Sequence, residues 1–265
     1  MPEGTRIITL FGDLTEIVYA LQAAEFLVGR DTSSVYPAET EVLPNLGFAG
    51  ALNVEAILAL EPTLVIGNSM AGPPGVLEQL EAAGVELLII ETPTGLDAPG
   101  IKIRAIGEAL GLSQTAEALA LDVERRMAAV LGQAQTVERP LRVLLIYIRR
   151  GGLQLVSGQG NEAQTIIEAA GGIDAGAESG IVGWQALTPE ALVAANPDVY
   201  LVMELGLDVI GGIDALLAIP GMAQTTAGRE RRVIAMSDLY LLGFGPRLPE
   251  AIAELSAYLR SLQEE

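Results

Sequence analysis

The sequence contains no cysteine and no histidine among its 265 residues. Without cysteine the chain can form no disulfide, thiolate zinc site or iron–sulfur cluster. Without histidine it lacks a Ser-His-Asp triad and the His-rich sites that transition metals prefer. An enzyme built on this chain would therefore have to use carboxylates, lysine or tyrosine. The absence of cysteine does not identify the compartment, because a reduced cytosol and a Cys-free exported protein look alike.

Positive charge is also scarce, with 15 Lys and Arg against 34 Asp and Glu and a net charge of −19. The sequence has no basic stripe of the kind that binds nucleic acid, so we expect no such partner. The negative field would also repel anionic lipid surfaces. The excess of negative charge either keeps the protein soluble or forms an acidic surface that docks on a basic partner.

Long hydrophobic runs are absent, although half of the residues are hydrophobic. The longest runs, LLII at 87–90 and VLLIYI at 143–148, are far shorter than the roughly 20 residues of a membrane span. They have the length of buried parallel strands, and we expect a soluble protein. The N-terminal MPEGTRIITL has neither the charged region nor the long apolar region of a signal peptide. The protein is therefore either cytosolic or a mature form whose leader has been removed.

Two stretches that begin 135 residues apart have nearly the same pattern: LNVEAILALEPTLVIG at 52–67 and LTPEALVAANPDVYLVM at 187–203. Each opens with a helix-capping residue, Asn53 or Thr188, and has a glutamate two positions later, Glu55 or Glu190. Each then continues as an apolar helical face, a proline turn and an apolar strand. A helix–strand unit that occurs twice at this distance predicts two similar α/β lobes, with a ligand cleft between them.

The rest of the chain fits this organisation. Residues 1–97 alternate strands and helices as a mainly parallel sheet does, and we expect them to form an N-terminal lobe. Residues 98–139 form a linker region, where about twenty helix-favouring residues follow the cap candidate Ser113. Residues 140–265 repeat the plan as a C-terminal lobe and end in a helix whose Ile252, Leu255 and Leu259 face inward. The fold class is α/β, with two Rossmann-like lobes joined by one long helix.

This pattern resembles the ABC-importer substrate-binding proteins that carry haem, siderophores or vitamin B12. Three segments are similar to haem carriers within that group: DTSSVYPAETEVLPNLGF at 31–48, LVSGQGNEAQTIIEAAGG at 155–172 and LLGFGPRLPEAI at 241–252. The resemblance covers nearly the whole chain, and SSxYP and LGFGPR are its more specific parts. It implies a monomeric extracytoplasmic or periplasmic protein without catalytic activity. This protein would capture haem in the cleft and deliver it to the permease dimer of an ABC importer. The full-length form could then carry a lipid anchor.

Tyr36 is the candidate haem ligand. A tyrosine before proline is also typical of an extended loop without any function. However, an anionic phenolate suits ferric iron, and tyrosine is an established axial ligand of haem. The resemblance implies this role, because the tyrosine of the family's motif is an axial ligand and Tyr36 matches it.

Three arginines are candidates for contact with the haem propionates or the pocket. Arg149 and Arg150 follow the first strand of the second lobe, at a predicted cleft edge, and guanidinium binds carboxylates through paired hydrogen bonds. Some relatives place a histidine ligand just before the Gly-Gly of this segment. Arg150 stands there in this chain, which favours a propionate contact or a steric role. Arg247 either contacts a propionate or pairs with a nearby carboxylate.

Other candidate pocket residues are aromatic or methionine side chains near predicted strand ends. Tyr240 and Phe244 either pack on a flat ring or belong to the core. Met70 and Met203 are either core filler, which methionine favours, or part of the pocket. Met70 and Trp184 complete the expected pocket.

Glu55 and Glu190 have a structural explanation, because carboxylates in a helix's first turn offset the positive end of the helix dipole. The family uses such a pair to dock on a two-subunit permease, and both explanations can hold together.

A corrinoid or ferric-siderophore carrier of the same architecture is the main alternative to a haem carrier. A zinc or manganese carrier would need histidines, and a cluster-bearing enzyme would need cysteine or histidine ligands. A cytosolic sugar or nucleotide enzyme is a further alternative, although no GxGxxG or GxxxxGK[ST] motif follows a strand.

Overall fold

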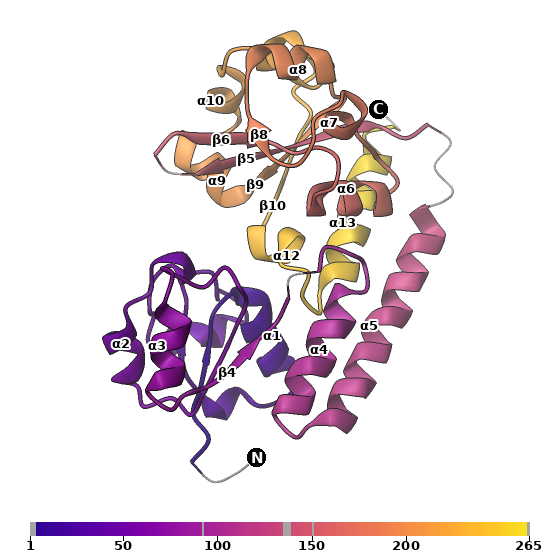
Figure 1. The fold of residues 1–265 in the computed structure, drawn as a ribbon. Helices are drawn as coiled ribbons and strands as arrows, with labels where there is room; N and C mark the ends of the chain where they lie inside the picture. The colour runs from indigo at the N-terminus through magenta and orange to yellow at the C-terminus, as the bar shows by residue number, and fades with distance from the viewer. Residues whose placement is uncertain (1–3, 92, 135–138, 150, 264–265) are drawn as a thin grey trace. The chain divides into compact units, whose positions relative to one another are not determined.

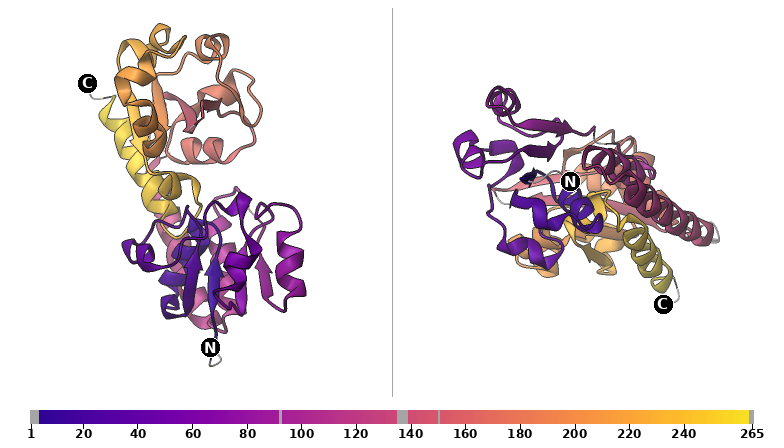
Figure 2. Two further views of the ribbon diagram at one scale, coloured as in Figure 1. Left: turned by 90° about the vertical axis from the view of Figure 1, so that its left-hand side faces the viewer. Right: turned by 90° about the horizontal axis from the view of Figure 1, so that it is seen from below.

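The computed structural model describes residues 4–91, 93–134, 139–149 and 151–263 (Figure 1). The chain divides into two compact units, each with its own sheet. The first comprises Met1–Arg126 with Gly243–Arg247, and the second comprises Met127–Leu242 with Leu248–Glu265. Figure 2 shows the helices that surround each sheet from two further directions.

The first unit is built on a four-stranded parallel sheet in the order β2-β1-β3-β4. Its strands are β1 (Ile7–Thr9), β2 (Leu27–Arg30), β3 (Leu64–Gly67) and β4 (Glu86–Ile89). Side chains alternate between two apolar clusters, because successive residues of a strand point to opposite faces. Ile7 and Ile66 belong to one cluster, and Ile8 and Val65 belong to the other. The central strands β1 and β3 are therefore buried on both faces. The run LLII at 87–90 was expected to be a buried strand, but β4 lies at the edge of the sheet and Ile89 is 37% exposed.

Helices cover both faces of this sheet. They are α1 (Gly12–Ala20), η1 (Ala24–Phe26), η2 (Ala38–Val42), η3 (Ala49–Ala51), α2 (Val54–Leu58), α3 (Val76–Ala82), α4 (Ala98–Ala109) and the first part of α5 (Ser113–Ala134). Helices α4 and α5 lie beside each other (Figures 1 and 2). Gly107 permits this contact, because a Cβ there would come within 2.1 Å of the Ala116 Cβ.

The linker region contains more than the single helix expected from Ser113 onward. Helix α4 precedes α5, and its Ile103 and Ile106 are fully buried in the same cluster as Ile7. The boundary between the two compact units falls at Arg126, within α5. Burial of α4 and of the first part of α5 assigns residues up to Arg126 to the first unit.

The second unit contains a six-stranded sheet in the order β10-β9-β5-β6-β8, with β7 also paired to β5. Its strands are β5 (Arg142–Arg149), β6 (Leu153–Val156), β7 (Ile173–Asp174), β8 (Gln185–Ala186), β9 (Val199–Met203) and β10 (Val233–Met236). The pairs of β5 with β7 and β9, and of β9 with β10, are parallel, whereas β6 is antiparallel to β5 and β8. The sheet is thus mainly parallel around its central strand.

The helices of the second unit are α6 (Glu162–Ala169), α7 (Ala175–Glu178), α8 (Pro189–Ala195), α9 (Glu204–Ile210), α10 (Ile213–Leu217), η4 (Met222–Gln224), α11 (Thr226–Arg229), α12 (Asp238–Leu242) and α13 (Leu248–Ser261). The inward-facing positions expected in the last helix are confirmed, because Ile252, Leu255 and Leu259 of α13 are buried. None of the described helices combines the length and the apolar character needed to cross a membrane.

Candidate functional site

Tyr36 lies in the loop that follows β2, at the carboxyl edge of the parallel sheet of the first unit. Its side chain is accessible, with 41% of the residue exposed. The Tyr36–Pro37 peptide bond is cis, and η2 begins immediately after the proline. Ligand sites of open parallel sheets form at this edge, so the loop presents Tyr36 where a bound molecule is expected.

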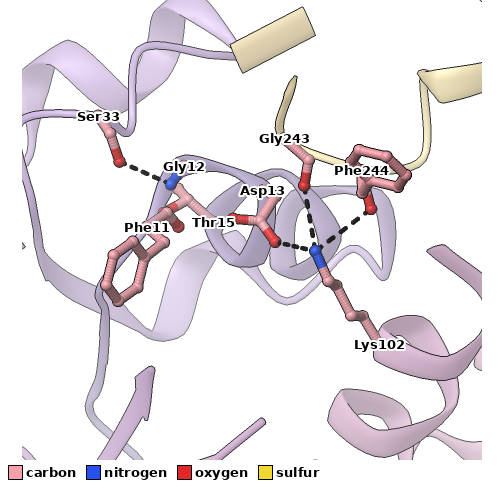
Figure 3. A network of polar contacts seen from close by, with 8 residues as sticks. All are labelled: Phe11, Gly12, Asp13, Thr15, Ser33, Lys102, Gly243 and Phe244. Atoms are coloured by element: carbon pink, nitrogen blue, oxygen red, sulfur yellow. Dashed lines mark hydrogen bonds and ion pairs between the residues drawn. The ribbon is translucent and has the colours of Figure 1, made fainter. Parts of the chain in front are cut away.

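Hydrogen bonds to the buried Asp31 fix the loop that carries Tyr36. Asp31 is 1% exposed, and its carboxylate accepts bonds from the backbone and hydroxyl of Ser33 (3.0 and 2.7 Å) and from the hydroxyl of Ser34 (2.7 Å). The Ser34 hydroxyl also contacts the Thr15 hydroxyl at 2.6 Å. Ser33 in turn accepts a bond from the backbone N–H of Gly12, at the start of α1 (Figure 3). The serines of the SSVYP motif therefore attach this loop to the sheet and to α1.

A guanidinium group covers one face of the Tyr36 ring. The Cζ of Arg247 lies 3.4 Å from the ring centroid. Its Nε and Nη2 donate to the two carboxylate oxygens of Glu16 at 2.9 and 2.8 Å. Such paired, charge-assisted bonds hold a guanidinium in one orientation. Of the two roles expected for Arg247, the structure therefore shows the carboxylate partner.

Burial affects the electrostatics of Glu16, whose side chain is only 5% exposed. Loss of solvation raises the pKa of its carboxyl above the ordinary value of 4.5, while the hydrogen bonds and charge of Arg247 act in the opposite direction. Glu16 and Arg247 therefore form a partly buried ion pair at the border of the candidate site.

An open groove of about 600 Å³ runs beside Tyr36 within the first unit. Its lining is formed by Glu16, Tyr19, Ala20, Tyr36, Pro37, Glu39, Leu119, Arg126, Pro246 and Arg247. These residues come from α1, η2 and its preceding loop, α5 and the Gly243–Arg247 segment. Sequence reasoning had singled out only Tyr36 and Arg247 among them.

Exposed apolar side chains follow the neighbouring strands at the same edge of the sheet. Val35 is 57% exposed, Phe48 is 70% exposed and Met70 is 62% exposed. A backbone bond from the Gly72 N–H to the Ala49 carbonyl joins the loop of Met70 to the turn after Phe48. Surface positions with this much apolar area indicate a contact surface for an apolar partner. Phe48 had given no local signal in the sequence.

In the second unit, an aromatic and charged stack forms at the end of β5. The Tyr147 and Trp184 ring centroids are 5.5 Å apart, and Arg149 lies 4.0 Å above the Tyr147 ring. Arg149 also forms an ion pair with Asp238 at the start of α12. Burial raises the pKa of Tyr147, and the nearby Arg149 partly offsets this effect. Arg149 and Trp184 were expected here, whereas Tyr147 and Asp238 were not.

The remaining candidates differ in their surroundings. Phe244 is a core residue, 3% exposed, with a positive φ of 51°, and Met203 is buried as core filler. Tyr240 is half-buried in α12. Arg150 lies outside the described residues.

Glu55 and Glu190 occupy equivalent local structures in the two units. Each is exposed in the first turn of a short helix, α2 or α8. Asn53 caps α2 by accepting a bond from Ala56 N at 2.8 Å, and Thr188 caps α8 in the same way. The internal repeat therefore extends from the sequence to the capping geometry.

Comparison with known proteins places these features in a family. The sequence model of the periplasmic binding protein family matches residues 7–239. The apo form of the periplasmic heme-binding protein RhuT from Roseiflexus sp. RS-1 is 48% identical to the chain, with a TM-score of 0.95. That alignment covers 97% of this chain and 98% of RhuT. The periplasmic heme-binding protein BhuT in complex with two hemes is 37% identical, with a TM-score of 0.90 and coverages of 97% and 98%.

Curated relatives are more distant. The chain is 27% identical to the uncharacterized ABC transporter substrate-binding lipoprotein YvrC of Bacillus subtilis, over 96% of this chain and 79% of YvrC. It is 24% identical to a vitamin B12-binding protein of Vibrio cholerae, over 98% of this chain and 91% of that protein.

Proposed function

Because the chain belongs to the periplasmic binding protein family, we propose that it captures haem outside the cytoplasm and delivers it to an ABC importer. The proposal is supported by the similarity to RhuT and BhuT, which are both periplasmic heme-binding proteins. The function is binding and transport, and members of this family are not enzymes.

Tyr36 is the proposed axial ligand of the haem iron. The observation that carries this assignment is the position of an accessible phenol under the Arg247 guanidinium, on a loop held by buried bonds. Ferric iron binds tyrosine as the phenolate, and the Arg247 guanidinium places a positive charge over the ring of that ligand. Glu16 keeps that cation in place. The rigid loop reduces the entropy that ligand binding would otherwise lose.

Apolar and charged groups at both units supply the rest of the proposed contacts. Val35, Phe48 and Met70 offer apolar surface to the porphyrin ring. Trp184 and Arg149 of the second unit are proposed to contact the ring and a propionate. Arg149 is already paired with Asp238, so a propionate would share this guanidinium with a protein carboxylate.

Titration with ferric haem tests the ligand. The wild-type protein should show the charge-transfer band of an iron-bound tyrosinate. Tyr36→Phe should lose the band and bind at least about tenfold more weakly, which is about 1.4 kcal/mol. Tyr19→Phe, in the same groove, and Tyr147→Phe, in the second unit, are matched controls that should keep it. If the band survives in Tyr36→Phe and disappears in Tyr147→Phe, the axial ligand is Tyr147 of the second unit and the assignment of Tyr36 is wrong.

A corrinoid is the second candidate ligand, favoured by the similarity to the vitamin B12-binding protein of Vibrio cholerae. Ferric siderophores are carried by the same wider group. Parallel titrations with haem, cyanocobalamin and a ferric siderophore distinguish these candidates. Tight binding of cyanocobalamin with no response to haem would replace the proposed cargo.

Delivery requires a partner in the membrane. We propose that Glu55 and Glu190 each bind a basic pocket on one subunit of a permease dimer, and that the carrier acts as a monomer. The exposure of both carboxylates and their equivalent helix positions support this pairing. A lipid anchor on the full-length protein would hold it near that permease, and the Bacillus relative YvrC is named a lipoprotein.

A further inference from the structure

Lys102 is a buried lysine whose ammonium group reaches from α4 to two other parts of the first unit (Figure 3). Only 2% of the residue is exposed. Its Nζ lies 2.7 Å from Oδ2 of Asp13, 3.1 Å from the Gly243 carbonyl oxygen and 3.5 Å from the Phe244 carbonyl oxygen. An ammonium group has three N–H donors, so these three acceptors can use all of them. The Asp13 carboxylate also balances the buried charge.

The two carbonyls belong to a segment from the far end of the sequence. Gly243–Arg247 is the part of residues 127–265 that belongs to the first unit. Its backbone has a positive φ at Phe244, a conformation that is unfavourable for a residue with a side chain. Such a turn persists where surrounding contacts hold it. The Lys102 ammonium supplies such a contact on both sides of the turn.

The same segment ends in the guanidinium that covers Tyr36. Between the two ends, Arg126 donates to the Pro246 carbonyl at 3.3 Å. Arg247 then reaches Glu16 and the Tyr36 ring. The contacts therefore run from Lys102 through the backbone of the segment to Arg247, and from Arg247 to Tyr36.

We propose that Lys102 is a positioning residue of the haem site, which holds Gly243–Arg247 so that the Arg247 guanidinium stays over Tyr36. This inference rests on the proposed function and adds a residue that no feature of the sequence had singled out. Lys102 acts on the iron ligand through the segment, without touching the ligand itself. Without it, Arg247 should leave the ring part of the time, and the phenolate should lose the cation that stabilises it.

The test measures, in charge-balanced variants, the haem spectrum and the rate at which haem is released to the acceptor apomyoglobin. The double variant Lys102→Met with Asp13→Asn removes both charges and avoids an uncompensated carboxylate in the interior. We expect the tyrosinate band to move to longer wavelength, because a phenolate without a nearby cation is the more easily oxidised donor. Dissociation should be about tenfold faster, equivalent to about 1.4 kcal/mol. Ile103→Ala in the same helix destabilises the core without touching the segment and should change neither quantity.

Chemical rescue separates positioning from general stability. Because the chain has no cysteine, Lys102→Cys creates a single thiol. Alkylation with 2-bromoethylamine in denaturant, followed by refolding, restores an ammonium group at nearly the original length. The rescued protein should recover the wild-type band and dissociation rate. Arg126 is a second cation that donates to the segment, and it is less buried than Lys102. Arg126→Gln should therefore shift the band position and the dissociation rate in the same direction as the double variant, by a smaller amount.

The outcomes separate the two proposals. A wild-type protein without a tyrosinate band refutes the proposed ligand, whatever Lys102 does. A wild-type band that the double variant and Arg126→Gln leave unchanged in position, with unchanged dissociation, overturns the role of Lys102. If aminoethylated Lys102→Cys recovers its stability but not the wild-type band, the positioning role of Lys102 is overturned as well.

Discussion

The loop that presents Tyr36 depends on Asp31, and Asp31→Ala tests this dependence. The substitution removes the acceptor of three hydrogen bonds at 2.7–3.0 Å, two from Ser33 and one from Ser34. Bonds to a charged group contribute about 1.5–3 kcal/mol each. Ser33 is exposed, so water can replace its two contacts. Ser34 is fully buried and must turn its hydroxyl toward Thr15. We therefore expect a loss of about 3 kcal/mol of stability.

The same change should weaken haem binding. If the loop loses its fixed conformation, binding must order it again, at about 1–2 kcal/mol for each residue that is newly ordered. One such residue corresponds to an affinity loss of about tenfold. Asp31→Asn keeps a neutral acceptor and should show about half of both effects.

Urea unfolding and haem titration measure the two quantities. Far-UV circular dichroism follows the whole chain, whereas Trp184, the sole tryptophan, reports on the second unit. Thr32→Ala is the matched control, an exposed change in the same loop that should stay within about 0.5 kcal/mol of the wild type. A stability of Asp31→Ala equal to that of Thr32→Ala would refute the buried network. A stability loss with unchanged haem affinity would refute its link to Tyr36.

Two further predictions concern Asp174 and the docking pair. Burial raises the pKa of Asp174 above its ordinary 3.8, so the native state binds a proton more tightly than the unfolded chain. The wild type should therefore gain stability as pH falls from neutral toward 3.8, whereas Asp174→Asn should not, as thermal melts across pH would show. The double variant Glu55→Lys with Glu190→Lys should lose uptake through the permease and keep its haem affinity, with a stability loss of about 1 kcal/mol per site. Glu78→Lys, in the first turn of α3, is the dipole control, and normal uptake by the folded double variant would contradict docking.

Sequence patterns predicted most elements of the fold because those elements are specified locally. The apolar run of β5 and the caps of α2 and α8 are read from a few adjacent residues. Helix α4 was not expected as a separate helix, because Pro99, Gly100 and Gly107 interrupt its sequence pattern. Pro99 is tolerated in the first turn, and Gly107 is required by the close approach of Ala116. Tertiary packing therefore decides this helix.

The candidate site was predictable only where a motif carries it. Tyr36 stands in SSVYP, and a resemblance could point to it. The partner of Arg247 could not be inferred, because Glu16 lies 231 positions away in the sequence. The carbonyl acceptors of Lys102 are backbone atoms, which any residue type provides, so the sequence contains no trace of them. Such pairs become visible only when the chain is folded.

The attachment of Gly243–Arg247 to the first unit has a consequence for biosynthesis. Two buried charged side chains of the first unit have partners that are synthesised much later: Glu16 binds Arg247, 231 residues on, and Lys102, besides Asp13, binds the Gly243 carbonyl, 141 residues on. A nascent chain that has released only its first half holds these groups without those partners, and burying them in that state is unfavourable. We therefore expect the packing around Glu16 and Lys102 to be completed only after the Gly243–Arg247 segment has been synthesised.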